Sequence, residues 1–239
     1  MRGKGSTLGL SLLPVFMWIL IQSIVVLAFT PAMLGLGNLL SVLGLETQGF
    51  YEFLNTNGSY LIYLLMDGGV LIPGIFWFRR LPPRQEKRRG GFFGITPGGI
   101  LLLVLAGFGL QMLSNLFLSF VFEAFPGLME SYAQVLENLG MNHPAFLSLL
   151  YTVLLAPATE ELLFRGLTLR ILEGPFPFWT ANTLQAFYFG VIHGNLVQGG
   201  YAFLAGLVMG YLVKRKGTLA AGVLCHFGVN FSGVLLGLL

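Results

Sequence analysis

Residues 144–169 read PAFLSLLYTVLLAPATEELLFRGLTL, and this stretch decides the fold class of the chain. Its charged residues are Glu160, Glu161 and Arg165, and most of the others are apolar. A helix needs about 20 apolar residues to cross roughly 30 Å of hydrocarbon, so a segment of this length predicts a membrane span. The span would then hold charged side chains well inside the bilayer.

The composition of the whole chain agrees with a membrane protein. Of 239 residues, 55% are hydrophobic and 10% are charged, and the mean hydropathy is +0.80. A soluble domain carries about 25% charged residues, so the composition excludes a soluble enzyme, a disordered chain and a nucleic-acid-binding protein. The length fits one integral-membrane domain, residues 1–239, and the single cysteine, Cys225, excludes an intrachain disulfide.

Several apolar segments are candidates for crossing the membrane, and together they predict an all-α transmembrane bundle of about seven spans. The predicted spans are residues 12–34, 59–78, 100–122, 144–169, 179–194, 200–213 and 218–238. We interpret the first as an uncleaved span rather than a signal peptide, because its apolar stretch is longer than the roughly 7–15 apolar residues of a signal peptide. The fifth and sixth are short, so the sequence defines their ends poorly.

The basic residues predict the orientation of the bundle. All lysines and arginines except Arg165 and Arg170 lie before the first span, between the second and third, or between the sixth and seventh. The positive-inside rule makes the side that these places share cytoplasmic. The predicted opposite loops, 35–58 and 123–143, contain acidic residues and no lysine or arginine. We therefore expect a cytoplasmic N-terminus and, because the loops are compact, a prokaryotic plasma membrane.

Polar side chains on three predicted spans fall in one layer of the membrane. At about 1.5 Å per residue, Glu160 and His226 each lie about 15 Å from the cytoplasmic edge, His193 about 20 Å and Asn230 about 21 Å. Ionisable groups at such depth are costly, and their default interpretation is functional. The shared depth favours one site over scattered structural residues.

Two further polar features lie at similar depth. Asp67, in the second span, is about 18 Å deep by the same helix rise. Its role stays open, because it either joins the site or bonds to polar groups of the third span. Those groups include Gln111, Ser114 and Asn115. A stripe of polar and aromatic residues at helical spacing runs along the fifth span, and its members are Asn182, Gln185, Phe189 and His193.

The spacing of the buried polar residues indicates hydrolytic chemistry. Glu161 and Arg165 can form an ion pair on one helix face, whereas Glu160 is rotated by about 100° toward another neighbour. A glutamate in an apolar environment is a suitable base for taking a proton from water near neutral pH. A neutral histidine can share that water. His226 and Asn230 point to one place and can donate to a developing oxyanion.

Three motifs, in their order along the chain, resemble those of a known family. They are Glu160-Glu161-x-x-x-Arg165, Phe189-x-x-x-His193 and His226-x-x-x-Asn230. This set resembles the CPBP intramembrane protease family, which includes the type II CAAX prenyl endopeptidase and the bacterial Abi proteins. The resemblance covers about residues 145–239, and the residues before it match only in being hydrophobic and multi-spanning.

The resemblance implies a membrane-embedded endopeptidase and a role for each motif residue. Glu160 looks like the general base, and His193 looks like its partner on the water. His226 and Asn230 look like the oxyanion-stabilising pair. The supporting residues would be Glu161, Arg165 and Phe189.

The cofactor and the partners follow less directly. Glu160, His193 and His226 have the donor atoms of a catalytic zinc site, which needs three protein ligands and a water. A metal-free site uses the same residues, and we favour it narrowly. The expected partners are a membrane peptide or lipidated protein as substrate and the surrounding lipid bilayer, with no nucleic acid.

Two other classes of protein place charges in a membrane. An ion-coupled transporter or channel uses midplane charges along an ion path, but it predicts inverted repeats or interrupted helices that the sequence does not clearly show. A non-catalytic membrane protein, such as an immunity or scaffold protein, is the third interpretation. Peptide hydrolysis within or beside the membrane is the leading hypothesis.

Overall fold

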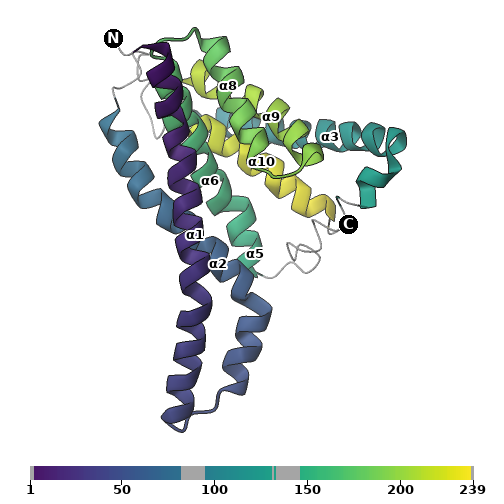
Figure 1. Cartoon of the computed structure of the whole chain (residues 1–239). Helices are drawn as coiled ribbons and strands as arrows, with labels where there is room; N and C mark the ends of the chain where they lie inside the picture. Colours follow the sequence, from purple (N-terminus) through teal and green to yellow (C-terminus); the bar gives the residue numbers. More distant parts are fainter. Residues whose placement is uncertain (1–2, 82–94, 131, 133–145, 238–239) are drawn as a thin grey trace.

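The computed structural model describes residues 3–81, 95–130, 132 and 146–237, and its regular secondary structure there is entirely helical, which confirms the predicted all-α class (Figure 1). The long helices are α1 (Lys4–Val42), α2 (Gln48–Arg80), α3 (Pro97–Ala124), α8 (Phe178–Val191), α9 (Leu196–Lys216) and α10 (Ala220–Gly237). Residues 146–172 form one helical stretch in five parts. These are α5 (Phe146–Leu150), η2 (Tyr151–Leu155), α6 (Ala156–Glu161), η3 (Leu162–Thr168) and α7 (Leu169–Leu172), of which η2 and η3 are π-helical.

In the part of the chain that the structure describes, five helices are long and apolar enough to cross a membrane: α1, α2, α3, α9 and α10. Within the described residues, each of the seven predicted spans falls mostly on a helical segment, but two of them do not meet this criterion. α8 has 14 residues, and the stretch 146–172 is divided by its π-helical turns. The chain is therefore a multi-pass integral membrane protein, and its span count is approximate.

The first two helices form an antiparallel hairpin that extends beyond the other helices (Figure 1). The prediction of an outer loop over residues 35–58 is wrong, because α1 and α2 continue through most of it. The apolar sequence carries α1 past the predicted span, and the chain turns only at Gly44, whose φ of 72° suits a residue without a Cβ. Tyr51 packs so closely on Gly37 across the hairpin that a Cβ there would collide with its ring.

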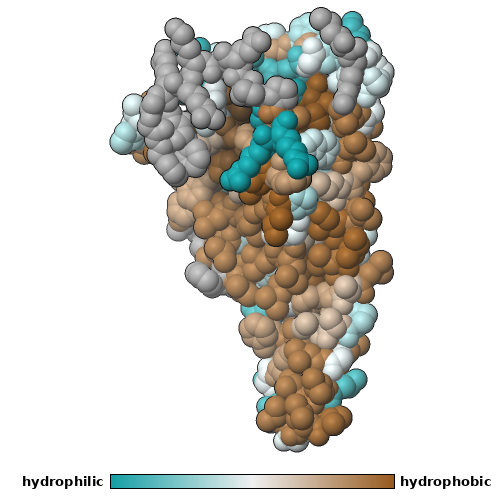
Figure 2. Space-filling view, turned by 90° about the vertical axis from the view of Figure 1, so that its left-hand side faces the viewer, coloured by the Kyte–Doolittle hydropathy of each residue, from teal (hydrophilic) through white to brown (hydrophobic). Residues whose placement is uncertain are grey.

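Large apolar side chains cover the outside of the hairpin and of the bundle. Leu27, Val42 and Ile72 are 76%, 84% and 76% exposed. Figure 2 shows an apolar surface that continues down one face of the molecule, with hydrophilic side chains gathered in its upper part and at its lower tip. Acyl chains would face this surface in a bilayer, where exposed apolar groups carry no penalty.

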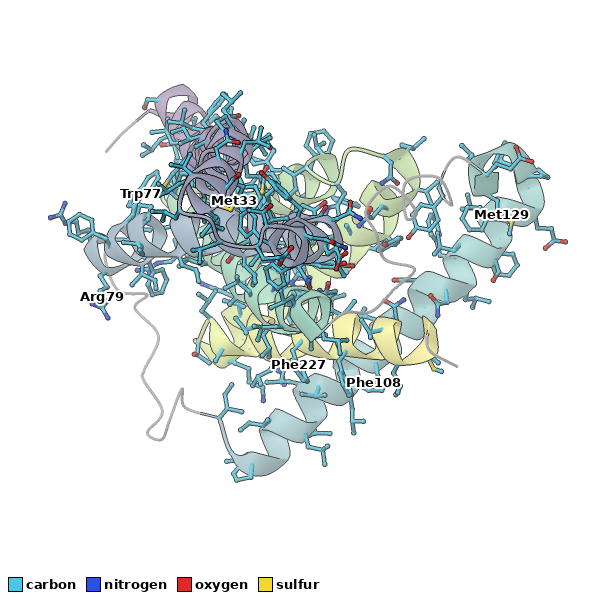
Figure 3. All side chains as sticks on the ribbon, turned by 90° about the horizontal axis from the view of Figure 1, so that it is seen from below. Met33, Trp77, Arg79, Phe108, Met129 and Phe227 are labelled. Carbon is cyan, nitrogen blue, oxygen red and sulfur yellow. The ribbon has the colours of Figure 1, made fainter. Side chains whose placement is uncertain are left out.

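The helices α3 and α10 cross in close contact (Figure 3). At Gly107 of α3 a Cβ would collide with the backbone of Cys225, and at Gly228 of α10 it would collide with the backbone of Val104. Small residues let helix backbones approach in this way within membranes. The crossing fixes α10, which carries two of the predicted site residues.

The described basic residues other than the buried Arg165 gather at one end of the bundle, as the sequence predicts. Arg170 donates to the backbone at the end of α2, and Lys214 pairs with Glu173 at 3.2 Å. Lys4 lies against the turn that follows α7. The basic residues between 84 and 89, which the sequence predicts on the same side, lie outside the described residues.

Candidate active site

Glu160 and Glu161 end α6, between two π-helical stretches, and such turns are frequent at functional sites. Pro157 explains why one backbone carbonyl of the first π-helical stretch, η2, lacks a backbone partner. In η2 the backbone bonds run five residues back, so the carbonyl of Thr152 faces Pro157, which has no N–H to offer. Asn230 of α10 takes this place, and its Nδ2 donates to the Thr152 carbonyl at 2.8 Å.

Glu161 is completely buried and joins two neighbours. Its Oε1 accepts a hydrogen bond from Arg165 Nη1 at 2.6 Å and lies 3.1 Å from His226 Nδ1. Arg165 is equally buried, and its guanidinium lies 4.3 Å from the ring centroid of Phe189. A carboxylate paired with arginine is an acceptor, so Nδ1 of His226 is the donor in this contact. The imidazole is therefore held in one tautomer and one orientation.

The other nitrogen of His226 faces Glu160. His226 Nε2 lies 3.7 Å from Glu160 Oε2, and the Glu160 side chain is 19% exposed, whereas that of Glu161 is fully buried. The two adjacent glutamates thus contact opposite nitrogens of one imidazole, as their rotation of about 100° around the helix allows. A separation of this size is one that a single water molecule can bridge.

Phe189 of α8 lies between the two histidines. Its ring meets His193 at 4.9 Å and His226 at 5.9 Å between centroids, with both imidazoles nearly perpendicular to it. His193 Nδ1 lies 2.7 Å from the Phe189 carbonyl oxygen, which can only accept, so Nδ1 donates. In a neutral ring with this bond, Nε2 is the acceptor.

The structure places His193 in a turn rather than in a helix. The span predicted at 179–194 ends earlier as a helix, because α8 stops at Val191 and His193 lies in the turn before α9. Gly194 adopts a φ of 72°, which stops the helix, and the side chain of Asn195 then caps α9. His193 therefore stands on a turn that both helices anchor.

Comparison with known families bears on these motifs directly. Residues 142–232 match the family described as type II CAAX prenyl endopeptidase Rce1-like. The match confirms the resemblance that the motifs predict. The Rce1-like region contains all three motifs, whereas α1, α2 and α3 lie outside it.

A relative is found among curated proteins. An uncharacterized 24.3 kDa protein of Escherichia coli is 32% identical over 96 residues, which cover 38% of this chain and 44% of the relative. The chain thus matches less than half of that protein's length. No solved structure matches the chain.

Within the Rce1-like region, the structure brings the predicted residues together to different degrees. Glu160 and His226 face each other directly, and His193 reaches the same place through Phe189. Asn230 lies one turn from His226 on α10, with one amide hydrogen engaged at Thr152. The bond to Thr152 was missed by sequence reasoning, although Pro157 in a buried helix is its signal.

Asp67 of α2 lies beside the site, although it is outside the Rce1-like region. It is 3% exposed and close enough to Glu160 for the two carboxylates to interact electrostatically. Tyr63, one turn earlier, stacks on Tyr151 of η2 with ring centroids 5.1 Å apart. Among the described residues, the polar groups of the third span bond within their own helix, as Gln111 and others do. The depth of Asp67 in the membrane, estimated from helix rise, is therefore the sequence signal that places it near the site.

A zinc site requires several donors to converge on one point. The donor types suit zinc, and Glu161 orients His226 as carboxylates orient metal-binding histidines. Over the described ranges, however, no three histidine, cysteine, aspartate or glutamate side chains come together as a metal site requires.

Proposed function

We propose that the protein is an intramembrane endopeptidase that hydrolyses a peptide bond with a water activated by Glu160 and His226. The single observation that carries the proposal is the placement of one imidazole between two glutamates. Glu161 accepts from Nδ1 at 3.1 Å, and Glu160 Oε2 lies 3.7 Å from Nε2. The match of residues 142–232 to the Rce1-like family supports the reaction class.

The roles of the two glutamates differ because their environments differ. Glu161 is committed to Arg165 and to the imidazole, so it orients His226 and does not reach a substrate. Glu160 is partly exposed and has no arginine at its side within the described contacts. A water between Glu160 and His226 donates one hydrogen bond to the carboxylate and one to Nε2. Glu160 then takes a proton as the water oxygen attacks the carbonyl carbon of the substrate.

His193 and Asn230 complete the proposed site. His193 presents an acceptor nitrogen from its turn, and this nitrogen takes the second hydrogen of the water when His226 Nε2 does not. Asn230 has an amide hydrogen beyond the one bound to Thr152, and this hydrogen can donate to the developing oxyanion. His226 becomes a donor as well once it carries a proton, and Glu161 stabilises that charge.

We propose that the site works without a metal, with Glu160 as the base that activates the water. The substrate is a membrane-associated peptide or a lipidated protein, since a site buried among apolar helices selects substrates from the bilayer. A prokaryotic plasma membrane is the proposed location, as the compact loops suggest.

The experiment uses the purified full chain in liposomes with sets of lipidated and transmembrane model peptides. Cleavage in ¹⁸O-labelled water should place one heavy oxygen in the new carboxyl terminus, because water is the nucleophile. Glu160→Gln should abolish cleavage, and Glu52→Gln, the same change on an exposed part of α2, should preserve it. Undiminished cleavage by Glu160→Gln would overturn the assignment.

A further inference from the structure

Three glycines, Gly206 and Gly210 of α9 and Gly222 of α10, adjoin buried polar side chains. A Cβ at Gly222 of α10 would collide with Glu161 Oε2, and a Cβ at Gly206 of α9 would lie 3.1 Å from Arg165 Nη2. These glycines therefore leave room beside the Glu161–Arg165 pair. The spacing of Gly206 and Gly210 is typical of helix packing, yet here both positions adjoin polar groups.

The polar groups opposite α9 come from α8. Asn182 and Gln185 are fully buried, and a Cβ at Gly210 would collide with the Asn182 side chain. Gln185 Nε2 donates to Asn182 Oδ1 at 2.8 Å and to the Gly206 carbonyl at 3.1 Å. Asn182 Nδ2 donates to the Leu207 carbonyl at 2.9 Å. The amide hydrogens of both residues thus fasten α8 to α9.

The same compartment contains buried polar atoms without protein partners. Among the described residues, Arg165 Nε and Nη2 have no acceptor, and Gln185 Oε1 has no donor. Both side chains are completely buried, and both lie against Gly206. Leaving such buried groups unsatisfied destabilises the protein, and buried water commonly satisfies them. The donors of Arg165 and the acceptor of Gln185 are complementary, and both side chains adjoin Gly206.

We propose that Gln185 is a positioning residue of the site and that an ordered water beside Gly206 connects it to Arg165. The water accepts a hydrogen bond from Arg165 Nη2 and donates one to Gln185 Oε1. Arg165 is then fixed from two sides, by Glu161 Oε1 and by this water. This inference rests on the proposed function in one respect. The water would hold Arg165, Arg165 holds Glu161, and Glu161 orients His226 for catalysis.

The first test separates the acceptor of Gln185 from its amide hydrogens. Gln185→Met removes both, and Gln185→Glu keeps an acceptor facing Arg165. We expect Gln185→Met to lower kcat on the order of tenfold with KM nearly unchanged, as loss of a supporting contact does. Gln185→Glu should restore most of kcat. If both variants lose kcat equally, Gln185 only fastens α8 to α9 and the proposal is overturned. Thr183→Val, an exposed change on α8, is the matched control.

The second test does not depend on catalysis, so it stands even if no peptidase activity is found. Unfolding temperatures are compared for Arg165→Met, Gln185→Met and the double variant of the full chain in detergent. Coupling through one water predicts that the double variant loses less stability than the sum of the two single losses. Additive losses would contradict it. A high-resolution structure in nanodiscs should show one density peak between Arg165 Nη2 and Gln185 Oε1, and a dry gap there would contradict the water.

Discussion

The side chain of Asn230 donates to the carbonyl oxygen of Thr152 at 2.8 Å, at the place where Pro157 leaves the helix without a backbone donor. This bond ties α10 to η2, one turn away from His226. An asparagine that the motif suggests for oxyanion binding therefore also has a structural task. The two tasks are separable by experiment.

Replacing Asn230 by alanine should lower both stability and activity. The loss of a buried hydrogen bond that leaves the Thr152 carbonyl unsatisfied costs about 1–3 kcal/mol. Adding Pro157→Ala to Asn230→Ala supplies a backbone N–H to that carbonyl, so stability should partly return while kcat stays low. Thermal unfolding in detergent and turnover of the same samples measure both effects. A double variant no more stable than Asn230→Ala would show that Pro157 does not explain the open carbonyl.

Glu161→Gln should be more damaging to stability than any other single change at the site. It leaves Arg165 charged and fully buried, and breaking a buried ion pair from one side costs about 3–5 kcal/mol. It also frees the imidazole of His226, so kcat should fall in the protein that still folds. Folded yield and unfolding temperature are compared with those of Glu52→Gln. Equal stability of the two variants would contradict the buried pair.

The crossing of α3 and α10 provides a test of the fold with an internal control. Gly107→Ala introduces a Cβ that collides with the backbone of Cys225, whereas Gly109→Ala, half a turn away, meets nothing within 4 Å. We expect Gly107→Ala to destabilise the protein by about 1–3 kcal/mol, as overpacking does. Gly109→Ala should be neutral. Similar unfolding temperatures for both variants would mean that the helices do not touch at Gly107.

Removal of metal should leave activity unchanged, since the proposed base and its partner are protein groups. Turnover is measured after treatment with a zinc chelator and dialysis, and the metal content of the same sample is determined by mass spectrometry. Activity that disappears with stoichiometric zinc and returns on adding it would contradict the metal-free proposal.

Much of the site is predictable from the sequence because helical spacing and membrane depth are simple geometric rules. The spacing of Glu161 and Arg165 places both on one face, and the structure shows their ion pair. The rotation of Glu160 away from that face also agrees, since it meets the opposite nitrogen of His226. These relations depend on one helix and its immediate neighbour.

Features that depend on the ends of helices or on contacts between distant segments were harder to predict. His193 was expected within a helix, but Gly194 stops α8 before it. The proximity of Asp67 to Glu160 depends on how α2 packs on the helical stretch 146–172, which spacing within α2 cannot reveal. The hairpin of α1 and α2 likewise continues beyond the predicted spans, because apolar segments can be longer than a bilayer requires.

The most direct measurement of the central claim is the energetic coupling between Glu160 and His226 in catalysis. Glu160→Gln, His226→Ala and the double variant are assayed for kcat/KM on one peptide substrate in liposomes. Each single change should reduce kcat/KM by about 100-fold or more, because a general base and its partner contribute at least this factor to the rate. If both residues act on one water, the double variant is no slower than the more severe single variant. A double variant whose loss equals the product of the two single losses would contradict the shared water.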